Sequence, residues 1–302
     1  MGQQVRASGN SIIIDGIMDF EPKHIFECGQ CFRWELESDG SYTGVVNGKI
    51  LNVAKKENEI IFNNTNLKYF TDYWIDYFDL NTDYGSIKKE LVKDDIVMKK
   101  ATEFGYGIRI LKQDPWETIA SFIISANNNI PRIKKAISLM SERYGEFIGI
   151  YNDRRYYTFP APEALMLLEE RDLKECNLGY RADYMIDTAR AIASNPALIA
   201  EIGQGNRLEC HKQLLQLKGV GPKVANCIAF FSFGKLDAFP VDVWIKRLME
   251  HFYFHKDTPP KEIEAFAQGK YKALAGYAQQ YLFYYGRELD LGKGDKDVRD
   301  NS

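Results

Sequence analysis

Residues 217–223 read LKGVGPK, and residues 240–242 read PVD. The first stretch separates two apolar runs with helical spacing, which predicts a helix over residues 206–217, a turn at 218–222 and a second helix from Lys223. Gly219 and Gly221 allow the turn to adopt a positive φ and allow another molecule to approach the backbone closely. The pattern is typical of a helix-hairpin-helix, which binds DNA without sequence preference. An ordinary helical hairpin with a glycine-rich turn is the alternative interpretation.

The predicted hairpin has two groups that suit a phosphate. Backbone amides at the start of the second helix point outward, where the helix dipole favours an anion. The carbonyl groups of Leu215, Leu217 and Val220 could hold a monovalent cation, Na⁺ or K⁺, that bridges to the same phosphate. We expect no other cofactor or metal.

Lys223 and Asp242 together suggest covalent chemistry. A lysine in the first turn of a helix meets the positive end of the dipole, and partial desolvation lowers its pKa further, so we expect a neutral, nucleophilic amine. Asp242 precedes a helical run and is a natural N-cap. An amine with a carboxylate beside it is the pair needed to cleave an N-glycosidic bond through a Schiff base. The alternative is a surface lysine that contacts phosphate.

The composition restricts the class of protein and its partners less strictly than these motifs do. The 302 residues are 45% hydrophobic and 13% aromatic, which predicts a globular protein. The net charge of −3 argues against a nucleic-acid partner, although a local basic face would be enough to bind one. No apolar run suggests a membrane span, and no secretory signal is visible. The five cysteines suit a reducing cytosol or nucleus, and the isolated Cys28-x-x-Cys31 is a weak signal for zinc or redox chemistry.

Secondary-structure patterns divide the chain into two parts. Residues 11–64 predict an antiparallel meander, with turn signals at Asp39-Gly40 and Asn47-Gly48. Helical periodicity begins near residue 67, and almost everything after residue 100 is predicted to be helical. We therefore expect an α+β fold. The predicted organisation is an antiparallel β domain with flanking helices (1–98), a helical domain (99–290) that contains the hairpin (206–233), and a polar tail (291–302).

The segment LKGVGPKVANCIAFFSFGKLDAFPVDVW, residues 217–244, resembles the catalytic segment of the 8-oxoguanine DNA glycosylases, a family of the helix-hairpin-helix superfamily with a catalytic Lys and Asp. The resemblance extends from about residue 20 to residue 290. The family's other motifs occur in order as GQCFRW (29–34), SFIISANNNIPRI (121–133), LGYRADY (178–184) and GYAQQYLF (276–283). It implies a TATA-box-binding-protein-like β domain packed on the helical domain. It also implies a bifunctional glycosylase/lyase that removes 8-oxoguanine, preferably opposite cytosine, and then cleaves the strand by β-elimination.

In such enzymes the damaged base is flipped out of the duplex into a pocket. The resemblance implies that Lys223 attacks C1′ of the sugar, with Asp242 as its electrostatic partner, and that Cys227 forms one wall of the base pocket. Gln279 and Phe283 match the residues that read and stack on the base, and their i, i+4 spacing places both on one helix face.

Gly29 matches the glycine whose carbonyl accepts the N7–H that 8-oxoguanine has and guanine lacks. One backbone acceptor can then discriminate between the two bases, because the wrong base leaves it unpaired.

In this family, other residues contact the DNA strand opposite the damaged base. Asn127 matches the residue that fills the gap left by the flipped base, and Tyr180 matches the wedge that buckles the duplex. Arg132 and Arg181 match the pair that contacts the estranged cytosine, whose acceptors suit guanidinium donors. Without the resemblance, Asn127 would belong to an ordinary polar loop and Tyr180 would be a core aromatic. Gln279 and Phe283 would belong to an ordinary amphipathic helix.

Two positions depart from the family's pattern. Asn226 stands where an Asp is common, and Trp244 stands where some members have a His that contacts phosphate. The Trp244 position leaves that phosphate contact in doubt.

The expected partner is double-stranded DNA that contains oxidised guanine, bound by a monomer that has no membrane association. The expected location is the cytoplasm (nucleoid) if the source is prokaryotic and the nucleus if it is eukaryotic. Two alternatives stay open: a glycosylase of the same superfamily for other damaged bases, and a non-catalytic helix-hairpin-helix protein that binds DNA.

Overall fold

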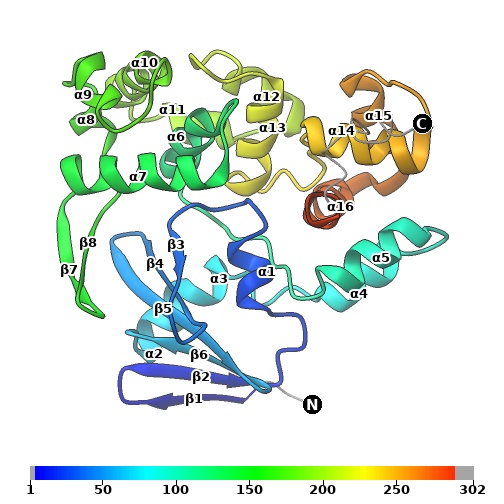
Figure 1. Ribbon diagram of the computed structural model, residues 1–302, viewed down its shortest axis with the longest axis horizontal. Coiled ribbons are helices and arrows are strands. Elements are labelled where there is room, and N and C mark those ends of the chain that lie inside the picture. Colours follow the sequence, from blue (N-terminus) through cyan, green and yellow to red (C-terminus); the bar gives the residue numbers. More distant parts are fainter. Residues whose placement is uncertain (1–3, 290–302) are drawn as a thin grey trace, which may run out of the picture.

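The computed structural model describes residues 4–289, which form a β-rich part and a helical part (Figure 1). The β-rich part is a six-stranded antiparallel sheet in the order β1-β2-β6-β5-β4-β3. Its strands are β1 (Gln4–Ser8), β2 (Ser11–Asp15), β3 (Trp34–Leu36), β4 (Tyr42–Val46), β5 (Lys49–Lys56) and β6 (Glu59–Asn63). The predicted α+β fold is confirmed.

The sheet follows the predicted pattern with one added strand. Asn47 and Gly48 both have positive φ, 48° and 67°, between β4 and β5, which is the backbone that an Asn-Gly hairpin turn requires. Ile12 and Ile14 of β2 are buried on one face, as an alternating strand requires. The strand β1 was not predicted; all five of its residues are exposed, so it buries no apolar face.

The helices of the first half begin and end at local signals. Asp83 and Asp95 cap α4 (Tyr84–Leu91) and α5 (Ile96–Phe104), so two short helices form here in place of one continuous helix. The others are α1 (Pro22–Phe26), α2 (Leu67–Tyr69), a π-helical turn (Phe70–Trp74), α3 (Ile75–Tyr77), α6 (Pro115–Ser125) and α7 (Ile130–Tyr144).

The second half is helical as predicted, except for one hairpin. Strands β7 (Phe147–Tyr151) and β8 (Arg154–Tyr157) pair around Asn152 and Asp153, which both have positive φ. The helices are α8 (Pro162–Leu165), α9 (Glu170–Lys174), α10 (Arg181–Ser194), α11 (Leu198–Gly203), α12 (Arg207–Leu214), α13 (Pro222–Phe231), α14 (Val243–Met249), α15 (Pro260–Tyr271) and α16 (Ala275–Glu288). A π-helical turn (Glu250–Phe254) follows α14, and a 3₁₀ turn (Lys272–Leu274) precedes α16.

The buried residues form two hydrophobic cores. The smaller core lies under the sheet, where Trp34 stacks on Phe26 at 4.0 Å between ring centroids, and Leu111 joins it from beyond the sheet. The larger core lies among the helices and includes Met98 of α5, which packs against α16. The domain boundary between residues 98 and 99 stays a prediction, and the predicted tail at 291–302 lies outside the described residues.

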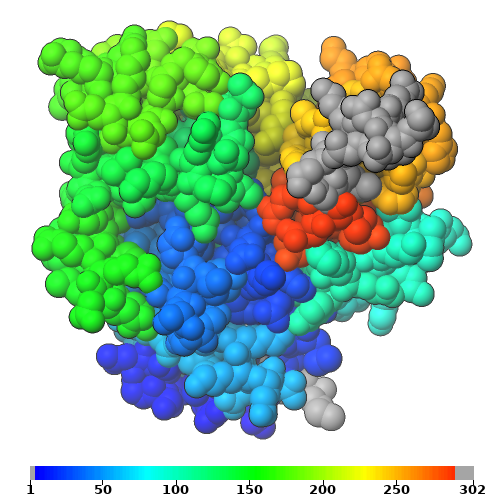
Figure 2. All heavy atoms as spheres, in the orientation of Figure 1, coloured from blue at the N-terminus to red at the C-terminus, as the bar shows by residue number. Residues whose placement is uncertain are grey.

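The segment from Glu27 to Cys31 connects the two parts. The fully buried Gln30 donates from Nε2 to the Arg109 carbonyl at 2.8 Å, and its Oε1 accepts the Leu111 N–H at 2.9 Å. From the other side, Gln280 of α16 donates from Nε2 to the Cys28 carbonyl at 2.8 Å. In Figure 2 the surface atoms of α16 (red) lie between those of the N-terminal part (blue) and those of the C-terminal helices (orange). This segment is therefore held in place by both parts.

Two further predictions concern cysteines and membranes. Cys28 and Cys31 are buried free thiols, and burial raises the pKa of Cys28 to about 12 and that of Cys31 well above its usual value. Both are therefore protonated at neutral pH. Within residues 4–289, no helix has the length and apolar character needed to cross a membrane.

Gly44 offers a test of the smaller core. A Cβ at Gly44 would lie 2.4 Å from the ring of Trp34, which is fully buried. Gly44→Ala is expected to lower the free energy of unfolding by roughly 1–3 kcal/mol through overpacking, measured by chemical denaturation. The matched control is Gly269→Ala in α15, where a Cβ meets nothing within 4 Å. That change should raise stability by roughly 0.5–1 kcal/mol, and equal effects of the two substitutions would contradict the packing argument.

Candidate active site

The hairpin turn between α12 and α13 uses its two glycines differently. Gly219 has a φ of 81°, and a Cβ there would lie 2.7 Å from the ring of Tyr184 on α10. Gly221 has an ordinary φ of −89° as the N-cap residue of α13, and a Cβ there would meet nothing within 4 Å. Backbone conformation and packing therefore account for the glycine at position 219 but not for the glycine at position 221. The open space at Gly221 leaves the first amides of α13 accessible to a ligand.

The turn is attached to α10 through Lys218. Its Nζ lies 2.8 Å from Asp183 and 2.6 Å from Asp187, and its carbonyl accepts the Thr188 hydroxyl at 3.1 Å. These two carboxylates raise the pKa of Lys218, so its charge is already paired. Phosphate binding at the turn would depend on backbone amides and not on this lysine.

Lys223 and Asp242 line the same open cavity, whose volume is about 600 Å³. Lys223 lies in the first turn of α13, and its Nζ is 5.5 Å from the centre of the Phe122 ring. Asp242 is the N-cap of α14, as predicted, and its Oδ1 accepts the Ile245 N–H at 2.8 Å. Asp242 is the one acidic residue among those that line this cavity. The structure thus places the amine and the carboxylate at one opening.

The predicted direction of the Lys223 pKa is wrong for the free protein. Burial lowers the pKa of Lys223, but its interactions with Cys227, one turn along α13, and with the Asp242 carboxylate outweigh burial and raise it above its ordinary value. Burial also raises the pKa of the Cys227 thiol and of Asp242. Before DNA binds, the amine therefore carries a proton, which must leave before Lys223 can act as a nucleophile.

The predicted base-reading residues lie on one face of α16 and on the loop beside it. Gln279 is 5% exposed, and its buried Oε1 has no hydrogen-bond partner among residues 4–289. Phe283, one turn further, packs against Gly29, where an added Cβ would lie 3.0 Å from the ring. Gly29 has a φ of 83°, so both its backbone and its surroundings favour glycine. An unsatisfied buried amide next to an aromatic ring is suited to a planar polar ligand.

The structure does not place every predicted residue in one cavity. Asn127 and Arg132 line the Lys223 cavity, whereas Gly29 lines a neighbouring cavity of about 680 Å³. Both cavities are bordered by the start of α7, through Asn129 and Arg132 on one side and Ile130 and Pro131 on the other. Cys227 is buried near Lys223.

The two predicted cytosine readers differ in this structure. Arg132 is exposed, and its guanidinium has no hydrogen bond or ion pair within the described part of the chain. Arg181 is buried, and it donates to the carbonyl groups of Ala126 at 2.6 and 2.8 Å and of Asn127 at 2.9 Å. Here Arg181 supports the 126–127 loop, where Asn127 has a φ of 50°. Tyr180 is 52% exposed beside the same loop, where an aromatic wedge would have to lie.

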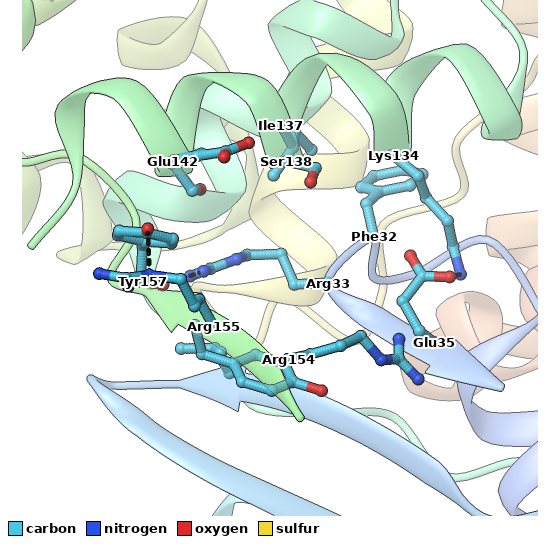
Figure 3. A pocket seen from close by; sticks show the side chains of 13 residues that line it. Phe32, Arg33, Glu35, Lys134, Ile137, Ser138, Glu142, Arg154, Arg155 and Tyr157 are labelled. Atoms are coloured by element: carbon cyan, nitrogen blue, oxygen red, sulfur yellow. Dashed lines mark hydrogen bonds and ion pairs between the residues drawn. The ribbon is translucent and has the colours of Figure 1, made fainter. Parts of the chain in front are cut away.

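Another cavity, of about 410 Å³, lies beneath α7 and beside β8 (Figure 3). Its cations already have partners, because Arg33 donates to the Tyr157 carbonyl and pairs with Glu117, and Arg154 pairs with Glu37. Lys134 pairs with Glu35 at 3.7 Å. These cations serve to hold the β7–β8 hairpin and α7 against the sheet.

Comparison with protein families identifies the whole arrangement. Residues 12–119 match the model of the 8-oxoguanine DNA glycosylase N-terminal domain, and residues 120–273 match the HhH-GPD superfamily of base excision DNA repair proteins. The chain is 47% identical to the structure of MBOgg1 in complex with a low-affinity DNA ligand, which covers 96% of this chain and 99% of that one with a TM-score of 0.92. This chain belongs to the 8-oxoguanine DNA glycosylase family.

Other relatives agree with this membership. The Clostridium acetobutylicum 8-oxoguanine glycosylase/lyase, in complex with double-stranded DNA containing cytosine opposite 8-oxoguanine, is 44% identical over 95% of this chain and 98% of that one, with a TM-score of 0.92. The N-glycosylase/DNA lyase OGG1 of Arabidopsis thaliana is 28% identical over 85% of this chain and 75% of its own. A probable N-glycosylase/DNA lyase of Methanothermobacter thermautotrophicus is 34% identical over 61% of this chain and 65% of its own, slightly less than two thirds.

Sequence reasoning missed two residues that line these cavities, Lys246 and Arg287. Trp244 and Lys246 line the Lys223 cavity, and Lys246 pairs with Glu250 and with Asp257. Arg287 lines the Gly29 cavity. The spacing of Gln279, Phe283 and Arg287, each four residues after the last, places all three on one face of α16 and could have found Arg287. For Lys246, the only signal was its closeness in sequence to Asp242, whereas Trp244 stands out in the sequence as a departure from the family's pattern.

Asp242→Asn tests the electrostatic coupling in this cavity. The amide keeps an oxygen that can accept the Ile245 N–H, so the helix cap survives, but the negative charge is lost. The pKa of Lys223 is therefore expected to fall, measured by NMR titration of ¹³C-methylated lysines. Asp257→Asn is the control, because Asp257 pairs with Lys246 and not with Lys223. A Lys223 pKa that stays unchanged in Asp242→Asn would show that the carboxylate does not act on the amine.

Proposed function

We propose that this protein is a bifunctional DNA N-glycosylase and β-lyase that excises 8-oxoguanine from double-stranded DNA. The observation that carries the proposal is that Lys223 and Asp242 line the same open cavity. Family membership supports it, because relatives are named N-glycosylase/DNA lyase and 8-oxoguanine glycosylase/lyase.

The chemistry follows from the two side chains. After losing its proton, the Lys223 amine attacks C1′ of the damaged nucleotide, and the bond from C1′ to the base breaks with its electron pair leaving on the base, which is then protonated. The Asp242 carboxylate stabilises the positive charge that develops on the sugar. Opening of the sugar ring gives a Schiff base between Lys223 and C1′. Loss of a proton from C2′ then expels the 3′ phosphate, and water releases the lysine.

Base recognition is assigned to α16 and the Gly29 loop. Gln279 reads the purine edge with an amide that is otherwise unsatisfied, and Phe283 stacks on its face. Cys227 forms the opposite wall, and the Gly29 carbonyl accepts the N7–H of the oxidised base. Because Gly29 and Lys223 line neighbouring cavities around the start of α7, DNA binding has to join these cavities for the flipped nucleotide to reach both.

The remaining residues hold the duplex. The amides after Gly221 bind a backbone phosphate, Asn127 fills the gap left by the base, and the exposed Tyr180 acts as the wedge. A Na⁺ or K⁺ at the carbonyls of Leu215, Leu217 and Val220 would add positive charge beside this phosphate. Oxygen donors suit such an ion, although the Leu217 oxygen already accepts the Val220 N–H at 3.2 Å.

The estranged cytosine is assigned to Arg132 and Arg181. The Arg132 guanidinium is free to contact the base in this structure. Arg181 would first have to give up its hydrogen bonds to the carbonyl groups of Ala126 and Asn127. We assign the protein, acting as a monomer, to the compartment that holds DNA: the cytoplasmic nucleoid if the source is prokaryotic and the nucleus if it is eukaryotic.

Borohydride trapping tests the nucleophile. Wild-type protein with a duplex that contains 8-oxoguanine is expected to form a covalent complex on reduction, because borohydride reduces the Schiff base to a stable amine. Lys223→Gln should retain DNA binding and form no such complex. Lys246→Gln is the control, because this lysine lines the same cavity but is already paired with two carboxylates. Equal trapping by wild type and Lys223→Gln would refute the assignment.

Opposite-base preference tests Arg132. Single-turnover excision from four duplexes, which place each base in turn opposite 8-oxoguanine, should be fastest opposite cytosine. Arg132→Ala should reduce that preference by about 5- to 100-fold, the value of one good guanidinium–base contact. The control is Arg143→Ala on the same helix, whose guanidinium pairs with Glu175 at 2.5 Å. A preference that survives Arg132→Ala unchanged would remove Arg132 from this role.

A further inference from the structure

Arg287 of α16 has a buried donor with no acceptor. Its Nη2 donates to the Glu27 carbonyl at 2.7 Å and lies 3.1 Å from the Glu288 carboxylate. Its Nη1 is buried and has no hydrogen-bond partner among the residues that the structure describes. A buried donor of a charged group costs more to leave unpaired than most polar atoms, so such a donor usually has an acceptor that is missing from the protein alone.

The Nη1 group points at the proposed base-reading residues. The guanidinium carbon lies 5.8 Å from the centre of the Phe283 ring. A Cβ built on Gly29 would lie 3.0 Å from Cε1 of Phe283 and 3.9 Å from Nη1 of Arg287. The Gly29 backbone, the edge of the Phe283 ring and the unpaired donor therefore meet at one point. Gly29 and Arg287 also line the same cavity of about 680 Å³.

The edge of 8-oxoguanine that faces such a point has three polar groups in a row. They are the C6 carbonyl, the N7–H and the C8 carbonyl, which present acceptor, donor and acceptor. A Gly29 carbonyl that accepts the N7–H satisfies only the middle group. A guanidinium donor beside that carbonyl satisfies a neighbouring carbonyl oxygen, and hydrogen bonds from an ionised donor are the stronger kind.

We propose that Arg287 is a further base-reading residue, whose Nη1 donates to a carbonyl oxygen of the flipped 8-oxoguanine beside the N7–H that Gly29 accepts. This assignment rests on the proposed function of the site. Arg287 acts at the base and not at the sugar, so it should be needed for excision of the base and not for the lyase step on a site that has already lost its base.

That separation provides the test. Single-turnover rates are measured for Arg287→Met on two duplexes, one with 8-oxoguanine and one with a preformed abasic site opposite cytosine. Met keeps an unbranched apolar stem of similar length but no donor. Excision of 8-oxoguanine is expected to fall by about 10- to 100-fold, the loss typical of one hydrogen bond to a charged group. Cleavage at the abasic site, which uses Lys223 without a base, should stay within about twofold of the wild type.

Two control variants separate base reading from structural support. Glu288→Gln removes a charged partner of Nη2 and leaves Nη1 in place, so both rates should stay at wild-type values. Arg287→Lys keeps a cationic donor and should recover part of the lost excision rate. Thermal unfolding of each variant reports whether α16 and the Glu27 loop still pack.

The outcomes are distinguishable. Equal losses of excision and of abasic-site cleavage in Arg287→Met would make Arg287 a structural residue and overturn the inference. Unchanged excision would overturn it as well. If the wild type itself neither excised 8-oxoguanine nor cleaved the abasic site, the proposed function would fail first.

Discussion

The site depends on an amine held between a thiol and a carboxylate. Lys223 and Cys227 are one turn apart on α13, while Asp242 caps a different helix, and both neighbours act on the pKa of the amine. Burial alone would favour a neutral amine, but the two neighbours reverse that effect. A protonated amine has no free electron pair and cannot act as a nucleophile. Reactivity at position 223 therefore requires that the amine first lose its proton.

Base recognition depends on a second constraint, the attachment of the Glu27–Cys31 segment to α16. Gln280 and Arg287 hold the carbonyl groups of Cys28 and Glu27 from the helical side, and Gln30 holds the segment from the β-rich side. Gly29 thereby packs against the Phe283 ring. The proposed discrimination by the Gly29 carbonyl requires a segment that is held in place, because a hydrogen bond weakens steeply when its angle or length changes.

Charge pairing reconciles the acidic composition with a DNA partner. Lys218, Arg33 and Lys246 are paired with carboxylates within the protein. Arg132 has no such partner within residues 4–289 and lies at the rim of the Lys223 cavity. In the proposed complex, backbone amides at the hairpin and a few unpaired cations supply the phosphate contacts, so affinity should depend on salt less steeply than in a strongly basic protein. Arg181 illustrates the opposite case, a cation that supports the loop expected to enter the duplex.

The sequence by itself determined the features that depend on neighbours along the chain. These include the hairpin turn at Gly219, the helix cap at Asp242, the Asn47-Gly48 turn, and the shared face of Gln279 and Phe283. The order of motifs also determined the family. Only the tertiary structure decided the direction of the Lys223 pKa, the engagement of Arg181 and the unpaired donor of Arg287. Each of these depends on groups from separate elements, and the packing that brings them together has no local signal. The strand β1 was missed for a related reason, since it buries no apolar face and only pairing with β2 makes it a strand.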